Sequence, residues 1–82
     1  MTHHEVLQLI EYIKTRTDIF ILGGDVLNKD DEYIYANWYY EWNPNISPAE
    51  NIDKSCDMVE RYISVLDNSK EYHYIAVLKE IN

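Results

Sequence analysis

The residues that could do chemistry in this 82-residue chain are one cysteine, three histidines and fifteen acidic side chains. A single cysteine cannot close an intramolecular disulfide. Cys56 also falls in the apolar stripe of a predicted helix, where a small buried side chain is more common than a nucleophile. His3 and His4 are adjacent and His73 is distant, so no pair has the i, i+4 spacing of metal ligands on a helix. We therefore predict no metal site and no cofactor.

Sequence motifs of enzymes are also missing from the chain. Gly23-Gly24 is not followed by the Lys-Ser or Lys-Thr pair of a phosphate-binding loop, and there is no Gly-x-Ser-x-Gly nucleophile motif. Neighbouring carboxylates such as Asp30 and Asp31 arise by chance among fifteen acidic residues. A domain of this size also offers little room for a walled cleft that excludes water. We predict no catalytic residues and expect that the protein is not an enzyme.

The net charge and the pI limit the kinds of partner that the protein is expected to bind. The net charge is −8 and the pI is near 4.6, which disfavours nucleic acids and anionic membranes and suits a basic protein partner. Solubility alone is the alternative explanation of this charge. The apolar run 74–78 is too short to cross a bilayer, and residues 1–5 lack the basic start of a signal peptide. We expect one cytoplasmic domain over residues 1–82, monomeric when free.

Hydrophobic periodicity and capping signals predict two helices and three strands. The first helix covers 3–15, and the second follows the N-cap Ser47 and ends near 66, each with a capping box. The strands start at residue 19, at 33 and at 72. Gly23-Gly24 interrupts the hydrophobic pattern of the first strand, and glycine inside a strand indicates a bulge or a close backbone approach. The second strand covers 33–42 and the third covers 72–78.

The element order α-β-β-α-β predicts an α+β fold. If the third strand pairs beside the first, the sheet is antiparallel throughout, with the strand order second, first, third. Both helices then cover one face, and the other face is partly open to water. The second strand becomes an edge of the sheet.

Six of the ten residues in 33–42 are aromatic. Alternation places Trp38 on the helix-covered face and Tyr39 on the open one. Half of the aromatic side chains therefore need only a role in the core, whereas tyrosines on an open face are typical of protein interfaces. Stacking on nucleic-acid bases would need a positive groove, which is missing. The predicted partner-binding residues of this region are Asp25, Asp30, Asp31, Glu32, Tyr33, Tyr35, Tyr39 and Glu41.

A second acidic group follows one side of the predicted second helix. Its members are Asp53, Asp57, Glu60 and Asp67, spaced so that they line up beside the apolar stripe. A solvated face that serves solubility is the simpler explanation. We nevertheless include Asp53, Asp57 and Glu60 among the candidate partner-binding residues.

Two short motifs carry a resemblance to a known family. The segment 22–26 contains Gly-Gly-Asp, and the second strand contains Asn37-Trp38-Tyr39. Together with the helix that follows, they resemble small immunity proteins of bacterial polymorphic-toxin and contact-dependent inhibition systems, and are most similar to immunity protein family forty. The resemblance covers residues 19–66. It implies that the protein binds and neutralises a cognate toxin domain.

The sequence thus supports an immunity protein that occludes a basic toxin domain without turnover. The alternative is an acidic adaptor, or a domain whose exposed second strand pairs with its own copy.

Overall fold

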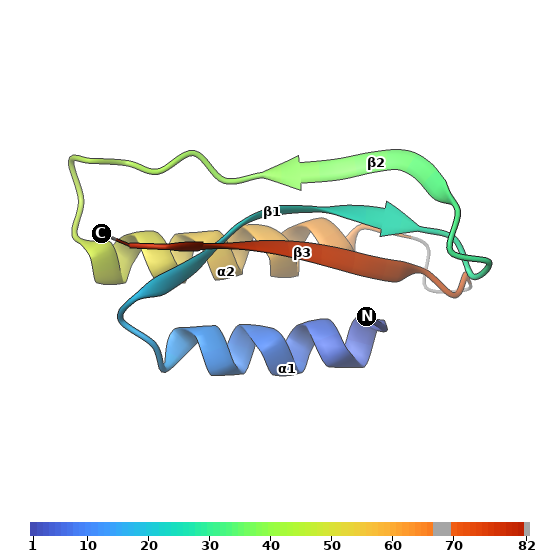
Figure 1. Cartoon of the computed structure of the whole chain (residues 1–82), viewed down its shortest axis with the longest axis horizontal. Helices are drawn as coiled ribbons and strands as arrows, with labels where there is room; N and C mark the ends of the chain where they lie inside the picture. Colours follow the sequence, from blue (N-terminus) through green and yellow to red (C-terminus); the bar gives the residue numbers. More distant parts are fainter. Residues whose placement is uncertain (67–69, 82) are drawn as a thin grey trace.

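The computed structural model describes residues 1–66 and 70–81. The elements follow the predicted order (Figure 1): α1 (His3–Lys14), β1 (Ile19–Leu27), β2 (Tyr33–Tyr39), α2 (Pro48–Ser64) and β3 (His73–Glu80). The three strands form one sheet in the order β2-β1-β3, and both pairings are antiparallel. The predicted α+β fold and strand order are confirmed.

Both helices begin at the residues that the capping signals indicate. Thr2 accepts the amide of Glu5 at 3.2 Å and donates its own amide to the Glu5 carboxylate at 2.9 Å, which completes a capping box. At α2, Ser47 accepts the amide of Glu50 at 3.1 Å. The predicted second capping box is only half formed, because the Glu50 carboxylate accepts the Ser47 hydroxyl at 3.3 Å instead of the Ser47 amide.

The core lies between the sheet and the two helices. Val6, Ile10 and Ile13 from α1 are buried against the α2 stripe of Ile52, Cys56, Val59 and Ile63. Strand side chains of one face join the same cluster, among them Trp38 and Tyr74. Both helices therefore cover the same face of the sheet, and β1 and β3 cross in front of α2 in the view of Figure 1.

Strand β1 runs through Gly23-Gly24 without a break. Its pairing with β3 shifts register between Ile21 and Gly23, which is the bulge that the glycines indicated. A Cβ atom on Gly24 would collide with the Trp38 indole and with the carbonyl oxygen of Ile75. The glycines thus mark both a bulge and a close approach.

Three predicted ends differ from the structure. Strand β2 ends at Tyr39 and not at Trp42, because the following residues are bound to α2: the Asn51 side chain accepts the Tyr40 hydroxyl at 2.7 Å and the Asn43 amide at 2.9 Å. Helix α2 ends at Ser64, two residues early. Its C-cap Val65 is 79% exposed. Strand β3 extends to Glu80, because its last residues pair with the start of β1.

Candidate functional site

The candidate site lies on the face of the sheet that the helices leave uncovered. Each row of paired residues crosses from β2 through β1 to β3, and alternate rows point to opposite faces. The rows that contain Trp38 and Val26 lie in the core. The rows that alternate with them form the open face: Tyr39–Gly23–Val77, Asn37–Asp25–Ile75 and Tyr33–Leu27–His73.

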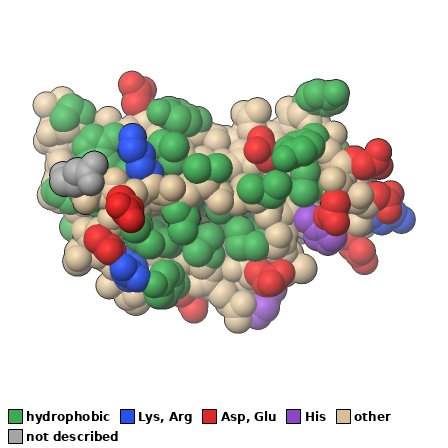
Figure 2. All heavy atoms as spheres, in the orientation of Figure 1, with side chains coloured by type: hydrophobic (Ala, Val, Ile, Leu, Met, Phe, Trp, Pro, Cys, Tyr) green, Lys and Arg blue, Asp and Glu red, His purple; other side chains and the backbone are tan. Residues whose placement is uncertain are grey.

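Large apolar and aromatic side chains stay in contact with water on this face. Tyr33 is 61% exposed and Tyr39 is 66% exposed, and on β3 Ile75 is 39% and Val77 46% exposed. Figure 2 shows hydrophobic side chains across the middle of the face and acidic ones at the end where the β1–β2 loop lies. Contiguous exposed apolar surface with a polar rim is typical of a binding surface.

Tyr35 has the most exposed side chain among these aromatics. The pairing of β2 with β1 jumps from Val26↔Ala36 to Leu27↔Tyr33, so Ile34 and Tyr35 are extra residues in a bulge. Tyr35 has φ of 60° and is 98% exposed. A tyrosine in the left-handed region costs about 1 kcal/mol or more, and strain of this kind concentrates at functional sites. The bulge therefore presents a strained aromatic side chain to solvent.

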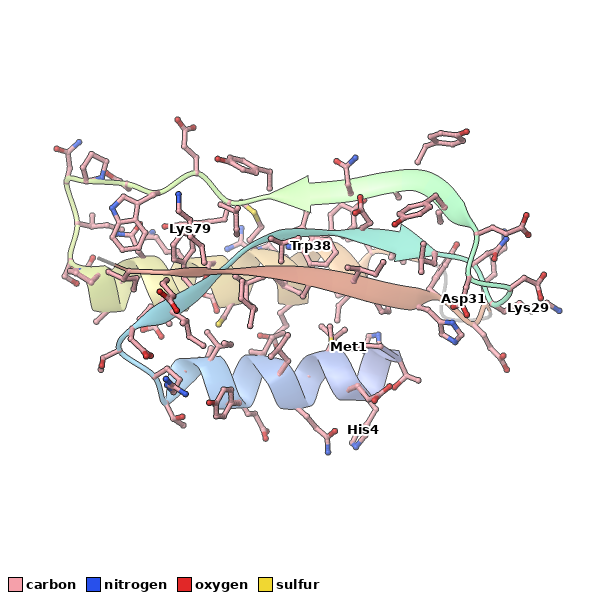
Figure 3. The ribbon with its side chains drawn as sticks, in the orientation of Figure 1. Met1, His4, Lys29, Asp31, Trp38 and Lys79 are labelled. Atoms are coloured by element: carbon pink, nitrogen blue, oxygen red, sulfur yellow. The ribbon has the colours of Figure 1, made fainter. Side chains whose placement is uncertain are left out.

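The acidic loop at one end of the face is held by specific bonds. The Asn28 side-chain oxygen accepts the amides of Asp30 at 2.9 Å and Glu32 at 3.0 Å. Asp31 has φ of 61°, and its carboxylate lies 2.6 Å from Nδ1 of His73 on β3. Asp31 and Lys29 lie at the loop end of the sheet, away from Trp38 (Figure 3). The three loop carboxylates are exposed, and those of Asp31 and Glu32 are held by His73 and by the Asn28 side chain.

The structure brings most of the predicted strand and loop residues onto one surface. Asp25 is half-buried between Asn37 and Ile75, whereas Asp30, Asp31 and Glu32 are exposed at the loop. Glu41 is exposed just beyond the end of β2. These residues thus share with the three tyrosines a surface that the helices do not cover.

The acidic residues of α2 lie on the other layer of the molecule. Asp53, Asp57 and Glu60 are exposed on the helix, so they are not continuous with the open face of the sheet. Asp57 also forms an ion pair with Lys14 of α1 at 3.6 Å. Asp67 lies outside the described residues. The predicted residues therefore form two separate groups.

The one cysteine of the chain lies in the core. Cys56 is fully buried, and burial raises the pKa of its thiol to about 11, so it stays protonated at neutral pH. No group of three or more histidine, cysteine, aspartate and glutamate residues is placed to hold a metal among residues 1–66 and 70–81. In the same ranges, no helix is both long and apolar enough to cross a bilayer.

Sequence analysis missed two buried polar residues of α2. Asn51 binds Tyr40 and Asn43 as described above, and its amide nitrogen donates to the carbonyls of Asn43 at 2.9 Å and Ser47 at 3.0 Å. The Ser55 hydroxyl accepts the amide of Ile21 at 3.3 Å. Asn51 and Ser55 are four residues apart and lie beside the apolar stripe of α2. This spacing was the sequence signal that could have identified them as buried. They fix α2 to β1 and to the segment after β2.

An α+β domain with a compact core and an open aromatic and acidic face is suited to binding another macromolecule. The family model for immunity protein 40 matches residues 1–78, and the chain belongs to that family. The motifs of the resemblance are paired in the structure, since Gly23, Gly24 and Asp25 lie opposite Tyr39, Trp38 and Asn37. Neither a curated protein nor a solved structure gave a significant match.

Proposed function

We propose that this protein neutralises a cognate bacterial toxin domain by binding it with the open face of its sheet. The family supports a toxin-immunity role. The observation that carries the proposed mechanism is the fully exposed, strained Tyr35 beside Tyr33 and Tyr39 on a surface without a covering helix. Tyrosine side chains bury a large area for little loss of rotamer freedom, which makes them effective anchors at interfaces.

The negative charge of the chain and of its acidic loop supports a toxin domain that is basic. The loop of Asp30, Asp31 and Glu32 lies at one end of the face, and the chain has a net charge of −8. Opposite charges raise the rate of encounter and select the orientation of the partner. In this mechanism the protein acts by occlusion in the cytoplasm of the producing cell, as a single domain that is monomeric when free, and without turnover.

The experiment measures the rate at which the purified chain associates with the toxin domain from the neighbouring reading frame. The toxin domain is made as a catalytically inactive variant. Because exposed charges are screened by salt, we expect the association rate to fall at least tenfold between about 20 mM and 500 mM salt. Asp30→Asn with Asp31→Asn and Glu32→Gln should reduce both the rate and its salt dependence. The comparison variant is Asp53→Asn with Glu60→Gln, which removes two carboxylates of the separate acidic group on α2. Absence of binding at any salt concentration would refute the proposal.

A self-associating adaptor is the second candidate function. It is favoured by the position of β2 at an edge of the sheet. Sedimentation of the free chain separates the two candidates, since the adaptor requires a dimer at micromolar concentration and the inhibitor does not.

A further inference from the structure

The outer edge of β2 has backbone groups without a strand to pair with. The amide of Tyr40 donates to the carbonyl of Leu22 in β1 at 2.7 Å. Alternate residues of an antiparallel strand point their backbone groups to the same side, so Trp38 also faces β1. Asn37 and Tyr39 consequently point their amides and carbonyls outward. Because the order is β2-β1-β3, no strand within the described part of the chain lies on that side.

A groove runs beneath this edge, between β2 and α2. It encloses about 660 Å³ and is lined from the strand by Trp38 and Tyr39. On the helix side its lining includes Lys54, Met58, Arg61 and Val65. Their spacing of i, i+4, i+7 and i+11 places all four on one face of α2. Val65, at the C-terminal end of α2, is an exposed wall of this groove.

The groove differs in charge from the rest of the molecule. Two of its lining residues, Lys54 and Arg61, form no ion pair with any residue in 1–66 or 70–81. Its carboxylate, Asp57, is paired with Lys14 of α1. In a chain with only seven basic residues, the groove therefore has an excess of unpaired positive charge.

We propose that an extended segment of the toxin pairs with β2 as a fourth strand of the sheet. This inference rests on the proposed function. The backbone of the segment pairs with the outward groups of Asn37 and Tyr39, as in strand-addition recognition. Because side chains alternate, every second residue of the segment enters the groove. The lining selects an apolar residue against Met58 and, two residues along the segment, an aspartate or glutamate that pairs with Lys54 or Arg61.

A second copy of this chain fits the groove poorly. The residues of β2 that point toward the helices are Ile34, Ala36 and Trp38, so a copy of β2 brings no carboxylate to Lys54 or Arg61. Pairing of two β2 edges would also bring the acidic loops of both copies toward Glu41 of the other. Like charges oppose that arrangement.

Reversal of the charge of Arg61 tests the inference, because two mechanisms predict opposite changes in the affinity for the toxin. If the protein attracts a basic toxin only through its negative charge, Arg61→Glu strengthens binding. If a carboxylate of the toxin enters the groove, Arg61→Glu weakens binding at least tenfold, and Lys54→Glu does the same. Lys79→Glu is the control, since Lys79 lies on β3, at the other end of the sheet from the acidic loop (Figure 3). Stronger binding of both groove variants would overturn the inference.

A backbone test addresses the strand pairing itself. Proline is tolerated in an edge strand where the amide faces outward, so Asn37→Pro removes one pairing donor, while Asn37→Ala retains it. We expect at least tenfold weaker binding of the inactive toxin domain by Asn37→Pro and little change for Asn37→Ala. A thermal melt verifies that each variant is folded.

Amide hydrogen exchange on the unmodified complex provides a measurement without mutations. The amides of Asn37 and Tyr39 should become protected when the toxin domain binds. Tight binding without that protection would overturn the strand addition and leave the proposed function intact. Absence of any binding would refute the proposed function itself. A free chain whose Asn37 and Tyr39 amides are protected in a concentration-dependent dimer would assign the edge to a second copy.

Discussion

The indole of Trp38 lies over Gly24, its partner in the neighbouring strand, and leaves no space for a side chain there. On its other side the indole packs against Tyr62 of α2, with ring centroids 5.5 Å apart. The pair therefore fixes the distance between the sheet and the helix. It also explains why the two motifs of the family resemblance occur together, since each glycine lies opposite a bulky residue of the other motif.

Gly24→Ala should be strongly destabilising. The new Cβ meets both the indole and the carbonyl oxygen of Ile75, and the backbone oxygen cannot rotate away. Overpacking of this kind costs about 3 kcal/mol in the free energy of unfolding, which is a large part of the stability of so small a domain. Urea unfolding followed by circular dichroism measures the loss. Asp25→Ala, one residue along the strand on the open face, is the control. An unchanged urea midpoint for Gly24→Ala would contradict the packing.

Truncation of Trp38 and Tyr39 should separate stability from binding. Trp38 is 6% exposed, and Trp38→Ala should cost about 3–5 kcal/mol of stability. Trp38→Phe should cost much less, because the buried indole N–H has no acceptor among the described residues and its removal leaves no bond broken. Tyr39→Ala should leave the thermal midpoint nearly unchanged and cost more than about 2 kcal/mol of toxin affinity. A large drop in the melting temperature of Tyr39→Ala would place it in the core instead.

Tyr35→Gly should make the free protein more stable and the complex weaker. Glycine relieves the left-handed conformation, which is worth about 1 kcal/mol, and removes the exposed ring. Tyr33→Gly is the matched control, because Tyr33 is also exposed but is not among the described residues with positive φ. That change should lower stability by about 0.5–1 kcal/mol. Chemical unfolding and titration with the toxin domain measure both effects. Lower stability of Tyr35→Gly would show that the bulge is not strained.

Cys56 should be unreactive in the folded protein and should make stability depend on alkaline pH. The pKa of its thiol is about 11 in the fold, against an ordinary value of 9.0, because burial disfavours the thiolate. Between these values the unfolded chain loses the proton and the folded chain keeps it. Stability therefore falls as pH rises from 9 to 11, by roughly 1 kcal/mol or more.

Two measurements test this prediction for Cys56. A thiol reagent at pH 8 should label the protein only at the rate of unfolding. Unfolding of Cys56→Ala from pH 8 to 11 should show a smaller decline in stability than the unmodified protein. Rapid labelling of the native protein would mean that the thiol is accessible.

The sequence alone determined those features that depend on local spacing. Capping residues placed the starts of both helices, and the period of two along 33–39 separated Trp38 from Tyr39. Element order and the short connections then left few ways to arrange three strands, so the strand order could be predicted. Local chemistry also marked Gly23-Gly24 as a special position.

Only the tertiary structure decided the features that depend on contacts between distant residues. Asn51 of α2 ends strand β2 early by binding Tyr40 and Asn43, and no periodicity within 33–42 contains that information. The bulge at Tyr35 follows from the mismatch of two paired strands. The same holds for the positive groove: Lys54 and Arg61 lie on an acidic helix, and only the packing of α2 beneath the β2 edge makes them its lining. Charge and register at a surface are set by which elements meet there, and a single sequence specifies that only through the fold.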